Sequence, residues 1–240
     1  MTIGRLYGVS LGPGDPELLT LKAARLVDAV PVVAYFAKQG RASNGRAIIA
    51  DRLKRDVVEL PLLYPVTTEI PLHDPAYRAA LDAFHDEAAA AIAAHLDAGR
   101  DVAVVSEGDA LFYGSYMHLH LRLAHRYLSE VVPGVTAMAG AAALAGVPLA
   151  QGDDTLCVLQ ATLHEDALAA RLAGCEAAVI MKVFRNLPRV RAALAKAGRL
   201  DQALYAERVG TPAQRVLRLV DHDGAPAPYF SIVLVPGWAR

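Results

Sequence analysis

Short runs of β-branched residues alternate with Ala- and Leu-rich amphipathic stretches, and this alternation constrains the fold of the chain more than any other feature. Strands are predicted at residues 5–11, 30–36, 56–63 and 101–108. Helices are predicted at 16–28, 44–54 and 74–98, and Gly99 is placed to end the last of them. Strands separated by helices indicate an α/β domain with a largely parallel sheet.

The pattern changes after residues 130–137. A helix of small residues is predicted at 135–145, and further helices are expected only near 165–172 and 187–197. Strand-like runs occupy 155–161, 176–184, 202–210, 214–220 and 229–237, the last three joined by short turns typical of antiparallel pairing. We therefore predict two α/β domains, 1–126 with a mostly parallel sheet and 130–240 with a mixed sheet, and a ligand cleft between them.

Composition excludes several classes of protein. The chain has 240 residues and a net charge of −1, and no block of Lys and Arg could follow a phosphate backbone, so we expect no nucleic-acid partner. The longest Ala-rich stretch, 87–99, carries charges and cannot span a membrane, and the N-terminus does not read as a signal peptide. Cys157 and Cys175 lie far apart in the sequence and predict two small buried residues. A cytoplasmic enzyme fits these bounds.

The turn after the first strand, "GPGDPE", raises the question of what it binds. Gly12 and Gly14 match the start of a dinucleotide-binding loop, but Glu17 stands where the third glycine belongs. Asp15 is placed to cap the following helix and Pro16 to begin it, so carboxylates already occupy the amides that a pyrophosphate would use. The turn therefore favours a ligand without phosphates, or a tight turn with no ligand at all.

Two later turns add to this site. "SEGDALFYGS", residues 106–115, follows a strand and should lie at the carboxyl end of the sheet, where open parallel sheets bind ligands. Its Asp109 suits ribose hydroxyls or a cation, or else it caps the next helix. "VPGVTA", residues 132–137, enters a helix and carries Thr136 in the first turn.

Taken together, these segments resemble the tetrapyrrole (corrin/porphyrin) methylase family. The resemblance is carried by "GVSLGPGDPELLT", "EGDALFYGS" and "PGVTA", with weaker matches at "VIMK" and "ERVGTPAQRV", and it runs almost end to end. It implies the tetrapyrrole methylase fold, S-adenosylmethionine as methyl donor, S-adenosylhomocysteine as product, and a cofactor cleft between the two domains. Two positions depart from the pattern: Ser10 replaces a glycine often found there, and Ala110 replaces the proline that usually follows Gly-Asp.

One segment indicates which reaction within the family the resemblance implies. The stretch 37–69, together with 185–194, 204–210 and 229–237, is similar to family members that methylate C20 of precorrin-2 to give precorrin-3A in cobalamin biosynthesis. Whether the substrate is metal-free or carries cobalt stays open, and the members that methylate C11 or C17 share the cofactor motifs. The resemblance also implies a homodimer.

The family positions that line the cofactor fall on nine residues of this chain: Pro13, Glu107, Gly108, Asp109, Phe112, Thr136, Ala137, Met181 and Gly210. Because the substrate is a polycarboxylate, basic side chains near the site are candidates to bind it. These candidates are Arg41, Arg46, Lys182, Arg185 and Arg189. Glu107, Tyr113, Asp153 and Asp154 are imaginable acceptors of the C20 proton, but the sequence selects no catalytic residue.

Four alternatives make different demands on the sequence. A metal site at His118, His120 and His125 is disfavoured, because residues two apart do not share a helix face and no Glu or Cys joins them. A methyltransferase of the same fold could act on a protein or on RNA, and an RNA target would need a basic face. A nicotinamide-dependent oxidoreductase would need the missing glycine. A tetrapyrrole carrier would bind substrate without any cofactor.

Overall fold

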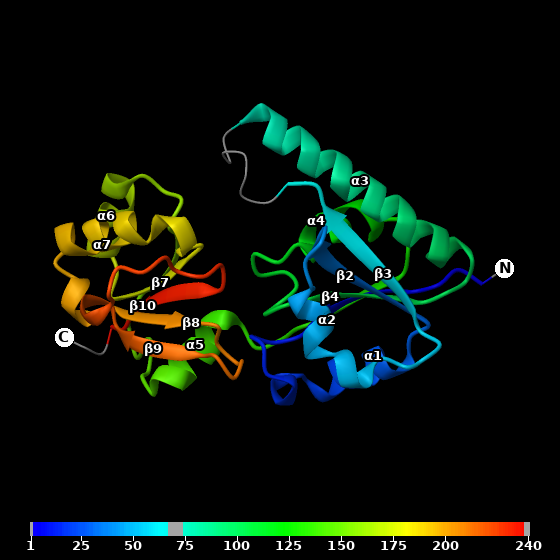
Figure 1. Ribbon diagram of the computed structural model, residues 1–240, viewed down its shortest axis with the longest axis horizontal. Coiled ribbons are helices and arrows are strands. Elements are labelled where there is room, and N and C mark those ends of the chain that lie inside the picture. Colours follow the sequence, from blue (N-terminus) through cyan, green and yellow to red (C-terminus); the bar gives the residue numbers. More distant parts are fainter. Residues whose placement is uncertain (1, 67–73, 238–240) are drawn as a thin grey trace. The chain divides into compact units, whose positions relative to one another are not determined.

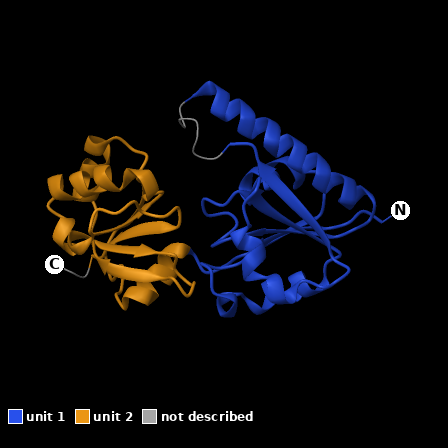
Figure 2. Ribbon diagram, viewed as in Figure 1, with its two compact units in different colours: residues 1–136 blue, residues 137–240 orange. Residues whose placement is uncertain are grey.

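The computed structural model describes residues 2–66 and 74–237, which form two compact units, 1–136 and 137–240 (Figure 2). Thr67 to Glu69, the last residues of the segment 37–69 that resembles the C20-methylating members, lie outside the described residues. The first unit extends beyond the predicted boundary at 126–130. The reason is that β5, Ser129–Val132, pairs in parallel with β1, Leu6–Ser10, and so completes the first sheet.

The first unit is built on a five-stranded parallel sheet with the order β3-β2-β4-β1-β5 (Figure 1). Its other strands are β2 (Val32–Lys38), β3 (Val58–Tyr64) and β4 (Val102–Ser106). Helices α3 (Pro75–Asp97) and α4 (Tyr116–Leu123) pack on one face of the sheet. Helices α1 (Leu21–Ala29) and α2 (Asn44–Ile48) pack on the other. The alternation of strands and helices thus correctly predicted a parallel sheet and four of its five strands, all except β5.

Two of the predicted helices in this unit are shorter than expected. The stretch 16–28 divides into a 3-10 turn, Pro16–Leu18, and α1, because the Thr20 hydroxyl accepts a hydrogen bond from the Ala23 amide and caps a new helix. Likewise, 44–54 divides into α2 and a 3-10 turn, Ala50–Arg52. At the end of α3, Gly99 has a φ of +78°, as expected of a glycine that ends a helix.

The second unit contains a mixed five-stranded sheet with the order β6-β7-β10-β8-β9. Its strands are β6 (Leu156–Gln160), β7 (Ala177–Met181), β8 (Leu204–Glu207), β9 (Arg215–Arg218) and β10 (Ser231–Val235). Only β6 and β7 pair in parallel; the later strands pair antiparallel, as the short turns predicted. Helices α6 (Glu165–Ala173) and α7 (Leu187–Lys196) cover one face, and α5 (Ala137–Ala145) covers the other.

No helix in the part of the chain that the structure describes is both long and apolar enough to cross a membrane. The longest, α3, contributes six buried residues to the core cluster of the first sheet, and its charged residues are exposed.

Candidate functional site

The loops that follow β1, β4 and β5 meet at the carboxyl ends of these strands. Gly12 and Gly108 form an antiparallel bridge in which each amide donates to the other's carbonyl, at 3.1 and 2.7 Å. Both glycines have positive φ, 74° and 67°, a conformation that other residues adopt at a cost. Pro13 therefore lies in a turn that is anchored directly to the Gly-Asp loop.

Asp15 caps the 3-10 turn after β1, as predicted. The Asp15 carboxylate accepts a hydrogen bond from the Glu17 amide at 2.8 Å, and Pro16 begins the 3-10 turn. This carboxylate occupies the position that a phosphate would need, so the turn is unsuited to a pyrophosphate.

The Asp109 carboxylate joins two of the three motifs. One oxygen accepts a hydrogen bond from the Leu111 amide at 3.0 Å, which closes its own loop. The other accepts from the Gly134 amide at 3.0 Å, in the Pro-Gly turn after β5. Sequence reasoning left the choice between ligand binding and capping open. The structure gives Asp109 the task of holding the two loops together, and each oxygen keeps further acceptor capacity.

The two departures from the family pattern are hydrogen-bonded to each other. The Ala110 amide, which a proline would lack, donates to the Ser10 hydroxyl at 2.9 Å. Both residues are fully buried, so no water can take the place of this acceptor. A proline at position 110 would have no amide hydrogen, whereas Ala110 has one that is buried in the core. Ser10, 100 residues earlier in the chain, accepts the hydrogen bond from this amide.

Gly134 is required by the same packing. A Cβ at this position would lie 2.5 Å from the Ser10 Cβ and 2.7 Å from the Gly108 carbonyl oxygen, distances that atoms in contact do not reach. The absence of a side chain at residue 134 thus allows the third loop to approach the other two.

Glu107 precedes these glycines and is turned toward α2. Its carboxyl lies against Gly45, where a Cβ would be 3.5 Å from one carboxyl oxygen, and the Gly45 amide hydrogen-bonds to it. Burial raises the pKa of Glu107, while the backbone amides oppose this effect. A carboxyl in this setting binds a proton more readily than an exposed one.

The aromatic pair in the Gly-Asp loop packs edge to face, with the rings of Phe112 and Tyr113 5.0 Å apart. Tyr113 has a φ of +57° and an exposed ring. A left-handed tyrosine costs roughly 1–3 kcal/mol and is typical of sites where the loop shape serves binding. The loop that precedes α4 is therefore held in a strained conformation beside Asp109.

Three of the predicted cofactor residues belong to the second unit. Met181 ends β7 and packs with Ala137, the first residue of α5, against the same apolar cluster. Gly210 follows β8 with a φ of +79°, and its amide donates to the Gln214 side chain at 3.0 Å. Thr136 is the last residue of the first unit.

The basic candidates have different surroundings. Arg46 is paired with Glu59 through two hydrogen bonds of 2.6 and 2.8 Å, an interaction that lowers the pKa of Glu59. The Arg189 guanidinium donates to the carbonyls of Ala161 and Leu163, at 3.4 Å each. Both side chains thus have structural partners.

Lys182 and Arg185 follow β7. Lys182 is a left-handed residue with a φ of +58°, and the Arg185 guanidinium lies 5.2 Å from the centre of the Phe184 ring. Among the described residues, none forms a hydrogen bond or ion pair with the Arg41 guanidinium. Arg41 is therefore the candidate whose charge is most available to a ligand.

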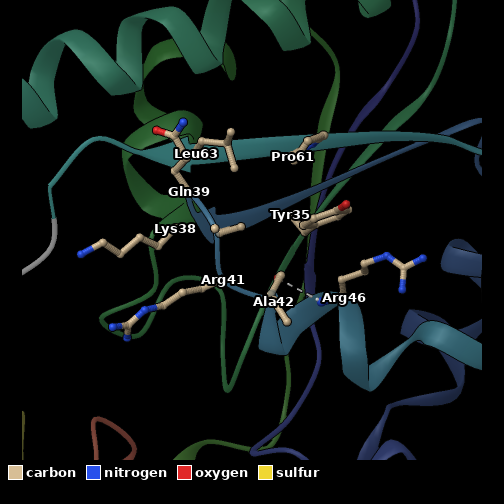
Figure 3. A pocket seen from close by; sticks show the side chains of 11 residues that line it. Tyr35, Lys38, Gln39, Arg41, Ala42, Arg46, Pro61 and Leu63 are labelled. Carbon is tan, nitrogen blue, oxygen red and sulfur yellow. Dashed lines mark hydrogen bonds between the residues drawn. The ribbon is translucent and has the colours of Figure 1, made fainter.

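Arg41 lines a pocket of about 400 Å³ at the carboxyl ends of β2 and β3 (Figure 3). Tyr35, Pro61 and Leu63 form its strand side, and Lys38 and Arg41 extend in one direction while Arg46 extends in the other. Sequence reasoning named Arg41 and Arg46 but missed Lys38 and Tyr35, whose place in the pocket follows from the pairing of β2 with β3.

His118 and His120 lie on α4, and His125 follows it. Across residues 2–66 and 74–237, no three side chains of His, Cys, Asp or Glu come together to hold an ion. His118 instead stacks on His85 of α3, with ring centres 4.3 Å apart. Burial, followed by the nearby His118 and Arg122, lowers the pKa of His85 to about 4.

Comparisons with known proteins identify the family of the chain. Residues 5–220 match the sequence model of the tetrapyrrole (corrin/porphyrin) methylases. The chain is 59% identical over 236 residues to a precorrin-2 C(20)-methyltransferase of Sinorhizobium sp, covering 98% of this chain and 96% of the relative. It is 33% identical to a cobalt-precorrin-2 C(20)-methyltransferase of Salmonella typhimurium, covering 97% and 96%.

A solved structure shares the fold as well. The uroporphyrin-III C-methyltransferase of Thermus thermophilus, complexed with S-adenyl homocysteine, aligns with a TM-score of 0.68 and 25% identity over 96% of this chain and 97% of that one. With a family match over residues 5–220 and relatives that align almost end to end, this chain belongs to the tetrapyrrole (corrin/porphyrin) methylase family.

Proposed function

We propose that this chain transfers the methyl group of S-adenosylmethionine to C20 of precorrin-2, giving precorrin-3A. The observation that carries the proposal is the joining of three motif loops at one sheet edge, through the Gly12–Gly108 bridge and the hydrogen bond from Gly134 to Asp109. Ligands of open parallel sheets bind at this edge. The 59% identity to a precorrin-2 C(20)-methyltransferase, against 33% to a cobalt-precorrin-2 enzyme, favours the metal-free substrate.

The residues of the loops suit this cofactor. The first turn presents carboxylates rather than free amides, which disfavours phosphate, and Asp109 places a further acidic group beside the glycines. Such a set fits a ligand with a positive sulfonium and ribose hydroxyls. Glycines at 12, 108 and 134 leave the backbone accessible to close approach.

S-adenosylmethionine, when bound, supplies a methyl group that is already activated for displacement. The protein's task is then to position the reactants and to exclude water. Asp109 performs the first part indirectly, because its two hydrogen bonds fix the loops against which a cofactor would lie. Met181 and Ala137, which pack against one apolar cluster of the second unit, stay predictions from the family resemblance.

The basic pocket provides a place for substrate carboxylates. Arg41 and Lys38 line it together with the Tyr35 ring, so a carboxylate and part of a tetrapyrrole could both find complementary groups there. We propose Arg41 as the principal contact, because Arg46 is already neutralised by Glu59.

The test is anaerobic incubation of the purified protein with freshly generated precorrin-2 and S-adenosylmethionine, followed by mass spectrometry. Addition of one methyl group, placed on C20 by NMR of isotopically labelled product, is the expected result. A methyl on another carbon, or transfer only to cobalt-precorrin-2, would replace the substrate and keep the family. Absence of S-adenosylhomocysteine binding in calorimetry would refute the cofactor.

We also propose a homodimer, on family resemblance alone, and a cytoplasmic location, where the two cysteines would stay reduced as the structure has them. Sedimentation at micromolar concentration should give twice the mass of the chain, and a monomer would contradict the proposal.

A further inference from the structure

The two cysteines of the chain meet in the core of the second unit. Cys175 is buried in the apolar cluster between the sheet and helices α6 and α7, and Cys157 packs against the same cluster. Sequence reasoning treated them as two separate buried residues, because their distance in the sequence hides the contact between β6 and the segment after α6. The chain contains no further cysteine, so any disulfide within it must join this pair.

The pairing of β6 with β7 explains the contact. Along β6, Cys157 and Leu159 lie on the same face of the sheet because side chains alternate, and both pack against the cluster beneath α6 and α7. Cys175 lies in the short connection between α6 and β7, the strand that pairs in parallel with β6. Burial first, and then a side-chain hydrogen bond with Cys157, raises the pKa of the Cys175 thiol to about 11.

The backbone around Cys175 is fixed by Arg199. The guanidinium donates hydrogen bonds of 3.2, 2.9 and 2.6 Å to the carbonyls of Leu172, Cys175 and Glu176. The Cys175 thiol donates a long hydrogen bond of 4.0 Å to the Leu172 carbonyl. The thiol is therefore positioned by its backbone, and it can turn to a new partner without breaking a strong interaction.

The two thiols differ in accessibility. Cys157 is partly exposed and lies on β6, an edge strand of the sheet, whereas only 5% of Cys175 is exposed. Thiol reactions require access as well as the thiolate form. A reagent in solution thus reaches Cys157 first, and Cys175 reacts with what has become attached to Cys157.

We propose that Cys157 and Cys175 form a reversible disulfide when a small disulfide such as oxidised glutathione accumulates. The Cys157 thiolate attacks one sulfur of the oxidant and forms a mixed disulfide, and the first glutathione leaves and takes up the proton that Cys157 lost. The Cys175 thiol then loses its proton and attacks the Cys157 sulfur, and the second glutathione leaves and takes up that proton. The protein loses two electrons, and the oxidant is reduced to two thiols.

The disulfide would tie the edge strand β6 to the segment after α6. It closes the loop 157–175, which contains all of α6, and such a closure restricts the unfolded chain more than the folded one. The second unit therefore gains stability when the oxidant accumulates and loses this gain on reduction. In a reducing compartment the pair stays a dithiol.

The experiment incubates the whole purified chain, without denaturant, in mixtures of reduced and oxidised glutathione with an increasing oxidised share. Each sample is quenched with acid, remaining thiols are alkylated with N-ethylmaleimide under denaturing conditions, and the intact mass is measured. We expect the doubly alkylated chain to be replaced by an unalkylated single chain, two hydrogen masses lighter than the reduced one. Dithiothreitol should reverse the change, and the oxidised form should unfold at a higher urea concentration.

Two variants test the order of the steps. Cys175→Ser should stop at the mixed disulfide and gain the mass of one glutathione, whereas Cys157→Ser should stay unmodified because its remaining thiol is buried. In the wild type, the second step should accelerate about tenfold for each unit of pH below the pKa of Cys175, because its thiolate share rises by that factor.

The wild-type masses decide the proposal even if a variant fails to fold. Two free thiols at every glutathione ratio, a bond that forms only in urea, or a mixed disulfide that the wild type never resolves would each overturn it. Chains linked to one another in a non-reducing gel would also overturn it, because the sulfurs would then react between molecules. None of these outcomes depends on methyl transfer, so they leave the proposed function untouched.

Discussion

The hydrogen bond between Ser10 and Ala110 predicts that Ser10→Ala destabilises the protein. Ser106, a neighbouring serine, provides the matched control. Ser10→Ala removes the only described acceptor of the Ala110 amide, which is fully buried. An unsatisfied buried amide costs about 1–3 kcal/mol, and we expect a loss of unfolding free energy in that range. Ser106 is the register partner of Ser10 on β4 and is equally buried, yet its hydroxyl has no hydrogen-bond partner among the described residues. Ser106→Ala should therefore change stability by less than about 0.5 kcal/mol.

Equilibrium urea denaturation followed by circular dichroism measures both variants. A second substitution tests the cause. Ala110→Pro removes the amide hydrogen, so in the double variant no donor is left unpaired. We expect Ser10→Ala combined with Ala110→Pro to be more stable than the sum of the single changes by about 1 kcal/mol or more. If the single effects add, or if Ser106→Ala costs as much as Ser10→Ala, the hydroxyl does not act through this hydrogen bond.

Three further predictions concern packing, pH and charge. Gly134→Ala should destabilise the protein by about 1–3 kcal/mol and weaken S-adenosylhomocysteine binding, because its Cβ would meet the Ser10 side chain at 2.5 Å; calorimetry showing unchanged affinity would contradict this. Because His85 titrates at about 4 when folded and near 6.5 when unfolded, the unfolded state binds more protons between these values, and stability should fall by about 2 kcal/mol from pH 7 to pH 5. Denaturation of His85→Phe at both pH values should show this loss removed. Arg41→Ala should raise KM for precorrin-2 several-fold with little change in kcat, whereas Arg46→Ala should mainly reduce stability, by up to about 1 kcal/mol, since its ion pair is partly exposed; steady-state kinetics showing the reverse order would refute the assignment.

Helices and strands were predicted well where they depend on residues close together in the sequence. Every strand except β5 was predicted from β-branched runs, and the Asp15 cap with Pro16 was identified correctly because a helix start depends on adjacent residues. The continuation of that helix was wrong, because Thr20 provides a second cap within the same apolar pattern. The short strand β5 was hidden next to its Pro-Gly turn and is defined by pairing with β1, more than a hundred residues earlier.

The family, its fold and its cofactor could be identified from the sequence and were confirmed by the comparisons. The individual roles of the motif residues could not, because they depend on contacts between segments that are distant in the chain. The pairing of Arg46 with Glu59 illustrates this: an arginine near a predicted site reads as available until the partner strand is placed beside it.

Asp109 shows how such contacts change the meaning of a motif. As a residue in a Gly-Asp loop, it invites a direct role with the ligand. Its two hydrogen bonds instead hold the loop after β4 to the turn after β5, 25 residues later. Replacing its carboxylate would therefore disturb ligand binding even if the ligand never touched it. Loss of affinity in an Asp109 variant therefore reports the loss of these two hydrogen bonds as well as any contact with the cofactor.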